Sequence, residues 1–175
     1  MKLKKPILNK GRLILRPFRL ADAKDLIAIK STTRTMGKIN TLPKAKLGIK
    51  NMNSKKHGYY LSVVLKEEKK VIGYVELCHL NWWEYKAGEI CYAINKKYTG
   101  KGYATEASTI LIDYCFKKLK FHKMYADTDP KNLASQKVLK KLGFKLEGVI
   151  REKHYSNGKW EDELDYGLLK KEWNR

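Results

Sequence analysis

The residues best suited to chemistry form one loop in the middle of the chain, Lys97-Tyr98-Thr99-Gly100-Lys101-Gly102-Tyr103-Ala104. An apolar β-rich run precedes it, and a helical pattern follows it. Backbone amides at the start of a helix point outward with the positive end of the helix dipole, and glycines let an anion approach them closely. Lys97 and Lys101 add positive charge. The loop therefore predicts a phosphate or pyrophosphate site, although an ordinary tight turn can contain the same glycines.

Two common nucleotide loops fit this segment poorly. A Walker-A loop needs Gly-x-x-x-x-Gly-Lys-Ser/Thr, which the sequence lacks. A dinucleotide loop of the form Gly-x-Gly-x-x-Gly needs a third glycine where Thr105 stands, and a βαβ unit near the start of a parallel sheet. Both nucleotide interpretations are therefore weakened.

The elements that must position the loop are predicted from hydrophobic spacing. Strand-like runs cover 13–16, 59–65, 71–80, 88–94 and 123–128, and two more lie around a Ser156-Asn157-Gly158-Lys159 turn. Helical patterns cover 22–30, 43–56, 104–119 and a segment that Asn132 caps and Gly143 ends. This order predicts a mixed α/β (α+β) fold with a largely antiparallel sheet and about four helices. It does not predict the regular alternation of a doubly wound fold.

Composition restricts the class of protein. The 175 residues fit a single domain, 1–175, and contain no apolar run of the roughly 18 residues that a membrane span needs. A basic start without a following apolar segment predicts no signal peptide, and three widely spaced cysteines suit a reducing cytoplasm. The net charge is +20, but nearly all the basic residues are lysines. This charge fits either an anionic partner or simply a solvated lysine-rich surface.

The loop and its surroundings resemble the GNAT-type N-acetyltransferases. Their cofactor loop reads Gln/Arg-x-x-Gly-x-Gly/Ala, and this chain has Lys97-Tyr98-Thr99-Gly100-Lys101-Gly102, departing only at the first position. Further motifs resemble the branch that acetylates ribosomal-protein N-termini: Leu15-Arg16-Pro17-Phe18, Asn132-Leu133-Ala134-Ser135, Lys141-Leu142-Gly143-Phe144 and Asn157-Gly158-Lys159-Trp160. The resemblance spans about residues 12–173, and it implies a central, mostly antiparallel sheet of about seven strands flanked by about four helices.

The resemblance implies acetyl-CoA as co-substrate and assigns residues to it. The strand before the loop would hydrogen-bond the pantetheine arm through its backbone, the loop amides would hold the pyrophosphate, and lysines of the later helix would neutralise the adenosine-side phosphate. The implied contacts are Cys91, Tyr92, Ala93, Ile94, Lys97, Tyr98, Thr99, Gly100, Lys101, Gly102, Tyr103, Ala104, Asn132, Ser135, Lys137 and Lys141. A strand amide near Tyr92 is the expected oxyanion donor.

The resemblance also suggests catalytic groups. Ser135 is expected to donate a proton to the departing thiolate of CoA. An amine must lose a proton before it attacks, and Glu89, acting through water, is the first candidate base, with Glu76 on the neighbouring strand as the second. Either carboxylate can equally be structural. Direct transfer needs no cysteine nucleophile, so Cys91 is expected to be a core residue, and the spacing of the histidines predicts no metal site.

Three functions remain open at this point. The first is acetylation of a protein or peptide N-terminus, such as that of a ribosomal protein. The second is acetylation of a small amine, a polyamine or an aminoglycoside, which the acidic stretch Glu161-Asp162-Glu163 could receive. The third is a basic nucleic-acid-binding module without catalysis, although the enzymatic functions require no nucleic acid. We expect no membrane partner, and the protein to be a monomer or a homodimer.

Overall fold

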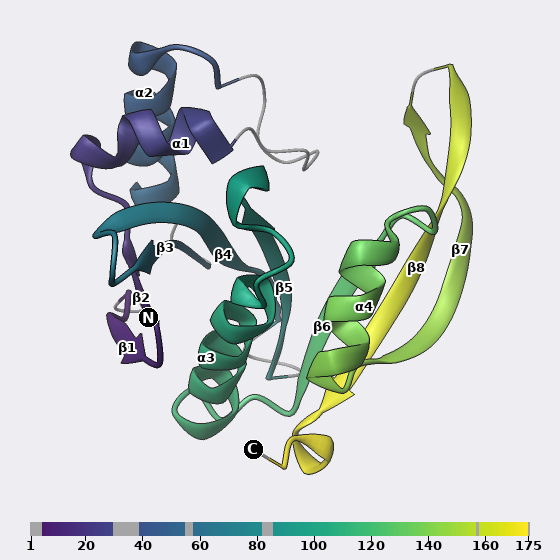
Figure 1. The fold of residues 1–175 in the computed structure, drawn as a ribbon. Coiled ribbons are helices and arrows are strands. Elements are labelled where there is room, and N and C mark those ends of the chain that lie inside the picture. The colour runs from purple at the N-terminus through teal and green to yellow at the C-terminus, as the bar shows by residue number, and fades with distance from the viewer. Residues whose placement is uncertain (1–4, 30–38, 55–57, 82–85, 157, 175) are drawn as a thin grey trace.

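The chain folds around one eight-stranded sheet in a computed structural model that describes residues 5–29, 39–54, 58–81, 86–156 and 158–174. The strand order is β1-β2-β3-β4-β5-β6-β8-β7. The strands are β1 (Leu8–Lys10), β2 (Leu13–Pro17), β3 (Tyr59–Leu65), β4 (Lys70–Asn81), β5 (Ala87–Ile94), β6 (Lys123–Thr128), β7 (Lys145–Ser156) and β8 (Lys159–Leu169). Neighbouring strands pair antiparallel except β5 and β6, which are parallel (Figure 1).

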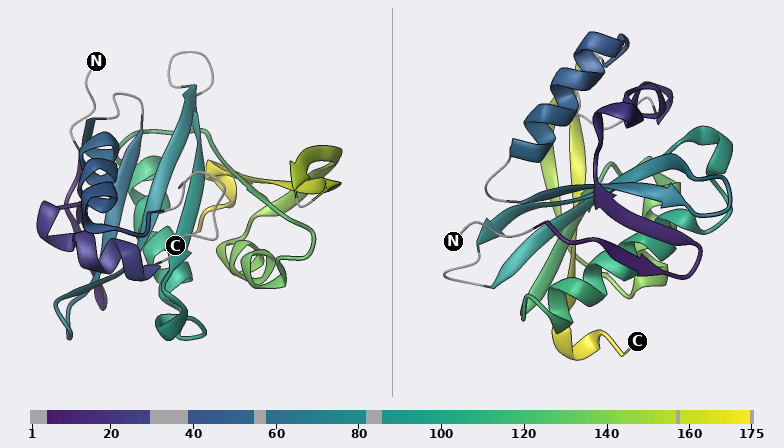
Figure 2. Two further views of the ribbon diagram at one scale, coloured as in Figure 1. Left: turned by 90° about the horizontal axis from the view of Figure 1, so that it is seen from above. Right: turned by 90° about the vertical axis from the view of Figure 1, so that its left-hand side faces the viewer.

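Helices cover both faces of the sheet. Within the described residues they are α1 (Ala23–Ile29), α2 (Leu42–Ser54), α3 (Tyr103–Lys117) and α4 (Leu133–Leu142), with 3-10 turns η1 (Leu20–Asp22), η2 (Lys96–Tyr98) and η3 (Lys170–Glu172). Helices α1 and α2 lie on one face of the sheet and α3 lies on the other, as the right-hand panel of Figure 2 shows. Helix α4 packs beside α3 and β6.

Two apolar clusters fill the space between the sheet and its helices. The larger lies on the α3 and α4 face and includes Leu77, Ile90 and Leu111, each at most 2% exposed. The smaller lies on the α1 and α2 face and includes Leu26 and Tyr74. Alternate residues of each inner strand therefore face different helices. The two faces can thus serve different ligands while sharing the backbone of β5.

The predicted mixed sheet with four helices is confirmed, with two local corrections. The sheet has eight strands rather than about seven, because Leu8–Lys10 pairs with β2 through a turn at Gly11. Three residues are too few to show a β pattern. Asp22 does not cap α1 as predicted: its carboxylate accepts hydrogen bonds from the Arg19 N–H at 2.7 Å and from Arg16. Asn157 of the predicted turn lies outside the described residues, and Ser156 pairs with Lys159 beside it.

Gly73 of β4 is predicted to be required for the packing of β4 on β5. A Cβ atom there would collide with the carbonyl oxygen of Ala93 and lie 2.6 Å from Cδ1 of Ile94. We expect Gly73→Ala to lower the free energy of unfolding by about 1–3 kcal/mol, measured by urea denaturation. Gly148→Ala is the matched control, because nothing lies within 4 Å of its Cβ position. An equal midpoint for the two variants would contradict this packing.

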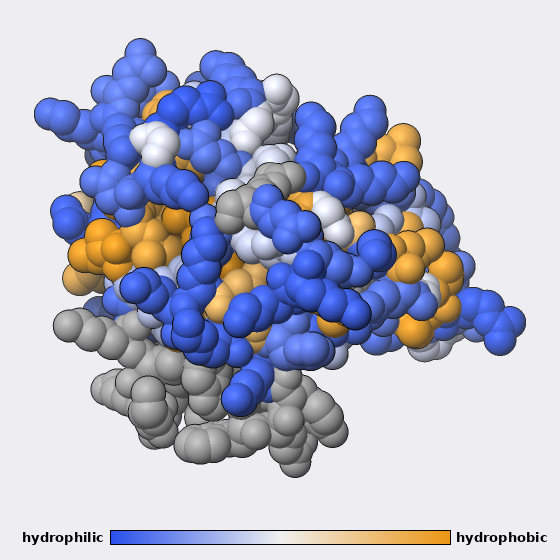
Figure 3. All heavy atoms as spheres, turned by 90° about the horizontal axis from the view of Figure 1, so that it is seen from below, coloured by the Kyte–Doolittle hydropathy of each residue, from blue (hydrophilic) through white to orange (hydrophobic). Residues whose placement is uncertain are grey.

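The surface reflects the composition. Hydrophilic residues predominate on the face shown in Figure 3, with smaller hydrophobic areas between them. Among the helices of the described residues, none has the length and apolar character needed to cross a bilayer.

Candidate functional site

The sheet opens between its two parallel strands. Strands β5 and β6 pair at Ala87–Lys123, Gly88–Met124 and Glu89–Tyr125, and no pairing follows although both strands continue. Beyond this point β5 still pairs with β4, up to Ile94 with Gly73. Among the described residues, one edge of β5 therefore has no strand partner from Ile90 onward. Its backbone groups can bind an extended ligand, as an added strand would.

The predicted phosphate loop lies at the end of this open edge. Gly100 and Gly102 have φ angles of 78° and 81°, a left-handed conformation that glycine adopts without steric cost. The first backbone hydrogen bond of α3 runs from the Glu106 N–H to the Gly102 carbonyl at 3.0 Å. The amides of Tyr103, Ala104 and Thr105 thus precede the helical ladder and face outward. These amides and the helix dipole have the geometry to bind an anion.

An arginine that the sequence analysis missed holds this helix terminus in place. The side chain of Arg12, just before β2, donates to Glu106 at 2.7 Å and to the Lys101 carbonyl at 3.2 Å. Its guanidinium also lies 4.3 Å from the centre of the Tyr103 ring. Arg12 stands more than 80 residues before the loop in sequence, so only the pairing of β2 in the sheet brings it here.

The face of the opening that α3 and α4 cover also carries Ser135. Asn132 caps α4, as predicted, by accepting a hydrogen bond from the Ser135 N–H at 3.0 Å. Tyr92 of β5 reaches across to α4: its hydroxyl donates to the Ser135 carbonyl at 3.3 Å and lies 2.9 Å from Oγ of Ser135. Burial raises the pKa of Tyr92 to about 12, so the phenol is protonated at neutral pH. Tyr92 and Ser135 thus form a hydroxyl pair that joins β5 to α4.

The opposite face of β5 carries the two candidate bases. Glu76 on β4 is 2% exposed and lies across from Cys91, while Glu89 lies across from Cys78. The Cys91 thiol donates to Glu89 Oε1 at 3.5 Å. Its hydrogen bond with Cys78 and its burial raise the pKa of Cys91, so this thiol is neutral at physiological pH. A neutral thiol is a poor nucleophile, which agrees with the expectation that Cys91 takes no covalent part. Cys78 and Cys91 are half-buried rather than core residues, and Cys115 alone of the three is fully buried.

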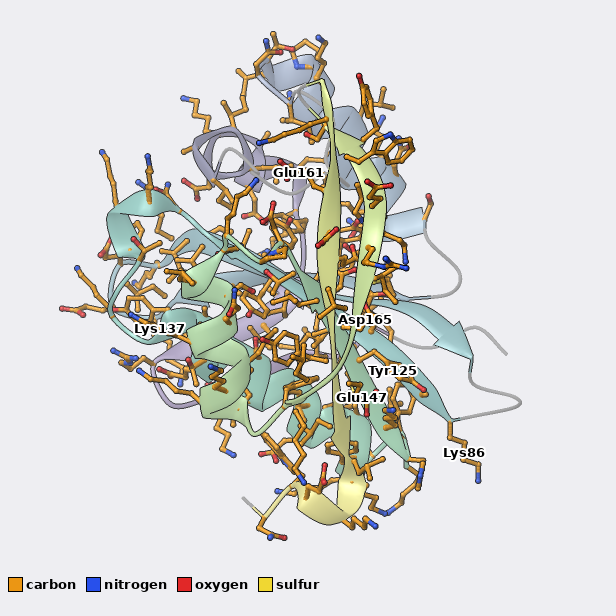
Figure 4. The ribbon with its side chains drawn as sticks, turned by 90° about the vertical axis from the view of Figure 1, so that its right-hand side faces the viewer. Lys86, Tyr125, Lys137, Glu147, Glu161 and Asp165 are labelled. Carbon is orange, nitrogen blue, oxygen red and sulfur yellow. The ribbon has the colours of Figure 1, made fainter. Side chains whose placement is uncertain are left out.

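A further carboxylate, Asp127 of β6, lies on the same face and was missed from the sequence. Desolvation by the surrounding protein and the negative charges of Glu89, Glu163 and Asp165 raise its pKa to about 6. Figure 4 shows Asp165 on β8 together with Tyr125 of β6, on the side of the sheet away from α4. We call Glu76, Glu89, Asp127, Glu163 and Asp165 the acidic face. Glu163 is also paired with Lys153 at 3.3 Å and with His154. The acidic face gathers five carboxyl groups in a chain of net charge +20.

The raised pKa of Asp127 predicts how stability depends on pH. The folded state holds its proton up to about pH 6, whereas the unfolded state releases it near pH 3.8, so ionisation disfavours folding as pH rises through this window. We therefore expect Asp127→Asn to raise the denaturation midpoint at pH 7.5 and to leave it unchanged at pH 3.5. Thermal unfolding at the two pH values checks this. A variant that is less stable than the parent at pH 7.5 would contradict repulsion within the acidic face.

The predicted site residues therefore divide between two faces of the open edge. The loop, Asn132 and Ser135 lie with α3 and α4, whereas Glu76 and Glu89 lie with α1 and α2. The lysines Lys97, Lys101, Lys137 and Lys141 are all exposed, and Figure 4 shows Lys137 on α4, across the sheet from Tyr125. A strand edge, an anion cradle and hydroxyls on one face, with carboxylates on the other, suit a long phosphorylated donor and a cationic acceptor.

Comparison with known proteins identifies relatives of this chain. A family model described as an acetyltransferase (GNAT) domain matches residues 12–145. The uncharacterized N-acetyltransferase YnaD of Bacillus subtilis is 31% identical over 170 residues, covering 93% of this chain and 96% of YnaD. The ribosomal protein uS5-alanine N-acetyltransferase of Escherichia coli is 29% identical over 130 residues, covering 74% and 67%. The spermidine N(1)-acetyltransferase of Escherichia coli is 34% identical over 92 residues, covering 53% and 49%.

A solved structure agrees with the fold. The acetyltransferase (GNAT family) from Bacillus anthracis matches with a TM-score of 0.82 and 28% identity, covering 95% of this chain and all of that one. The arrangement of strands and helices around the open edge is therefore shared with an acetyltransferase of known structure.

Proposed function

Because this chain belongs to the GNAT acetyltransferase family and is an N-acetyltransferase, we propose that it moves an acetyl group from acetyl-CoA directly to the amino terminus of a protein or peptide. The observation that carries this proposal is the opening between β5 and β6, with an anion cradle and Ser135 on one face and carboxylates on the other. Donor and acceptor can then approach the same strand from opposite sides.

The residues of the donor face fit acetyl-CoA. Nothing lies within 4 Å of the Cβ position at Gly100, so the loop leaves open space where a side chain would otherwise stand. The amides from Gly100 to Ala104 would hold the pyrophosphate; those of Tyr98 and Thr99, which were also expected there, donate instead to the carbonyls of Asn95 and Lys96. The open edge of β5 from Cys91 to Ile94 would pair with the pantetheine arm. The side-chain amide of Asn132 would contact the same arm, and Lys137 and Lys141 would neutralise the adenosine-side phosphate. When bound, acetyl-CoA supplies the activated acetyl thioester.

The two faces divide the proton transfers between them. Glu89, or the more buried Glu76, accepts a proton from the acceptor ammonium through water. A backbone amide near Tyr92 on the open edge stabilises the negative charge that develops on the thioester carbonyl oxygen. On the donor face, Ser135 gives a proton to the departing thiolate, and the Tyr92 hydroxyl beside it can replace that proton. No covalent attachment to the enzyme is needed.

An α-amine is the acceptor that best suits these groups. Its pKa of about 8 leaves a substantial neutral fraction at physiological pH, whereas a lysine amine near 10.4 requires a stronger base. The relative that acetylates the alanine of ribosomal protein uS5 supports the same choice. A polyamine is the second candidate, because the acidic face would attract a polycation and a spermidine acetyltransferase is also related.

The acceptor is tested by measuring CoA thiol release with a panel of amines. We expect turnover with peptides that have a free N-terminal alanine or serine, and none with the same peptides blocked at the N-terminus. Spermidine and an aminoglycoside are the comparison acceptors. A kcat/KM for spermidine that exceeds that of every free peptide would overturn the proposed acceptor in favour of the second candidate.

A further inference from the structure

Two cross-strand pairs place two thiols and two carboxylates side by side on the acidic face. In the β4–β5 register, Glu76 faces Cys91 and Cys78 faces Glu89. Residues two apart on a strand share a face, and directly opposed residues have Cβ atoms about 4.5–5.5 Å apart. The four side chains therefore form the corners of a small rectangle. Neither the peptide acceptor nor acetyl transfer requires two thiols there.

Two separations within this group match those of a tetrahedral metal site. Sγ of Cys78 lies 3.8 Å from Sγ of Cys91, and Oε1 of Glu89 lies 3.5 Å from Sγ of Cys91. With Zn–S bonds of about 2.3 Å and Zn–O bonds of about 2.0–2.2 Å, tetrahedral angles place two sulfurs about 3.8 Å apart and a sulfur and an oxygen about 3.5 Å apart. Ligand atoms of Glu76, Cys78 and Cys91 all lie within 4.8 Å of one another.

We propose that Glu76, Cys78 and Cys91 bind a divalent cation of the Zn²⁺ class, with Glu89 beside the fourth coordination position. Thiolate ligands select Zn²⁺ and Cd²⁺ over Mg²⁺ and Ca²⁺, which take oxygen ligands. On binding, each thiol releases its proton to solvent and its sulfur donates a lone pair to the cation, so charge is balanced and nothing is oxidised. The strand pairing already places the two thiols and the two carboxylates on one face of the sheet.

The position of this site has a consequence for catalysis, which rests on the proposed function. A cation held by Glu76 beside Glu89 withdraws both candidate bases from the acceptor amine. The phosphate loop and Ser135 lie on the other face, so acetyl-CoA binding is unaffected. The cation therefore inhibits turnover without displacing the donor, and a chelator restores activity.

The site is tested by titrating the full-length, reduced protein with Cd²⁺ and Zn²⁺. We expect one equivalent of Cd²⁺ to produce thiolate-to-metal charge-transfer absorption in the ultraviolet, with release of protons. Cys78→Ser and Cys91→Ser are each expected to weaken binding at least about tenfold, and Glu76→Gln to weaken it less. Cys115→Ala is the matched control, because the Cys115 thiol is fully buried in α3. This variant is expected to leave the Cd²⁺ titration unchanged.

Several results would overturn the site. One is unchanged Cd²⁺ binding in both serine variants, provided that circular dichroism shows them to be folded. Another is an affinity for Mg²⁺ equal to that for Zn²⁺. A third is a Cys78–Cys91 disulfide, detected by mass spectrometry, in place of metal binding. The catalytic consequence is measured separately. We expect Zn²⁺ to lower kcat with an unchanged Kd for acetyl-CoA, and Cys78→Ser to relieve this effect. If the protein binds the metal but is not inhibited, the cation site does not lie beside the bases that serve the acceptor. If the protein binds the metal but acetylates no amine, only the proposed function is contradicted and the metal site stands.

Discussion

Gly100→Val is expected to weaken acetyl-CoA binding by roughly 10- to 100-fold. A β-branched residue at a φ of 78° is strained by about 1–2 kcal/mol. Its side chain would also fill the open space that the loop keeps for the pyrophosphate, and each 1.4 kcal/mol lost is tenfold in affinity. Calorimetry with acetyl-CoA measures the loss directly, without any knowledge of the acceptor.

Gly158→Val distinguishes the loss of the phosphate-binding space at the glycine loop from the effect of backbone strain on stability. Gly158 has a φ of 80° and, like Gly100, has nothing within 4 Å of its Cβ position, but it lies in the turn between β7 and β8. The two variants therefore carry the same local strain. We expect Gly158→Val to bind acetyl-CoA with the affinity of the parent protein. Equal loss in both variants would assign the effect to general destabilisation and remove the loop from the binding site.

Ser135→Ala is expected to lower kcat about 100-fold with little change in acetyl-CoA affinity. General acid catalysis contributes about 10²–10⁴ in rate, and the Ser135 hydroxyl has a defined neighbour in Tyr92. The Ser135 backbone N–H still donates to the Asn132 side chain in the variant, so the N-terminal cap of α4 is kept. Steady-state kinetics with a saturating acceptor give kcat, and calorimetry gives the affinity. An unchanged kcat would remove Ser135 from catalysis.

Tyr92→Phe identifies which hydroxyl is the acid. In the proposed arrangement Tyr92 orients Ser135 and can resupply its proton, and its hydrogen bonds to Ser135 contribute about 0.5–1.5 kcal/mol each. We therefore expect a loss of kcat of about tenfold, smaller than that of Ser135→Ala. A larger loss in Tyr92→Phe than in Ser135→Ala would make the phenol the proton donor to the leaving thiolate.

Local signals in the sequence were sufficient for the conformation of the glycine loop and of the α4 cap. The glycine loop and the Asn132 cap depend on backbone conformations that a few neighbouring residues determine, and the structure shows both where they were predicted. The cationic roles of Lys137 and Lys141 stay predictions, because exposed lysines can reach many positions around α4. Arg12 could not be found in this way, since its contact with Glu106 joins the start of β2 to the first turn of α3, 94 residues later in the chain.

The thiols and carboxylates on the acidic face depend on tertiary contacts that hydrophobic spacing in the sequence does not predict. Cys78 and Cys91 stand 13 residues apart in the sequence and show no metal-binding spacing, yet the β4–β5 register brings their sulfurs to 3.8 Å. Asp127 looks like an ordinary polar position of an alternating strand. Only the approach of β6 to β5 and β8 places it among other carboxylates and raises its pKa. Predicting either feature requires the strand pairing and not only the strands.

Direct acetyl transfer across the opening between β5 and β6 can be tested by single-turnover mass spectrometry. The enzyme is mixed with acetyl-CoA, first without an acceptor and then with a peptide that has a free N-terminus. Direct transfer predicts an unmodified enzyme in the first step, and in the second a peptide with one acetyl group on its α-amine and one CoA released per peptide. An acetylated enzyme in the first step that passes its acetyl group to the peptide in the second would contradict it.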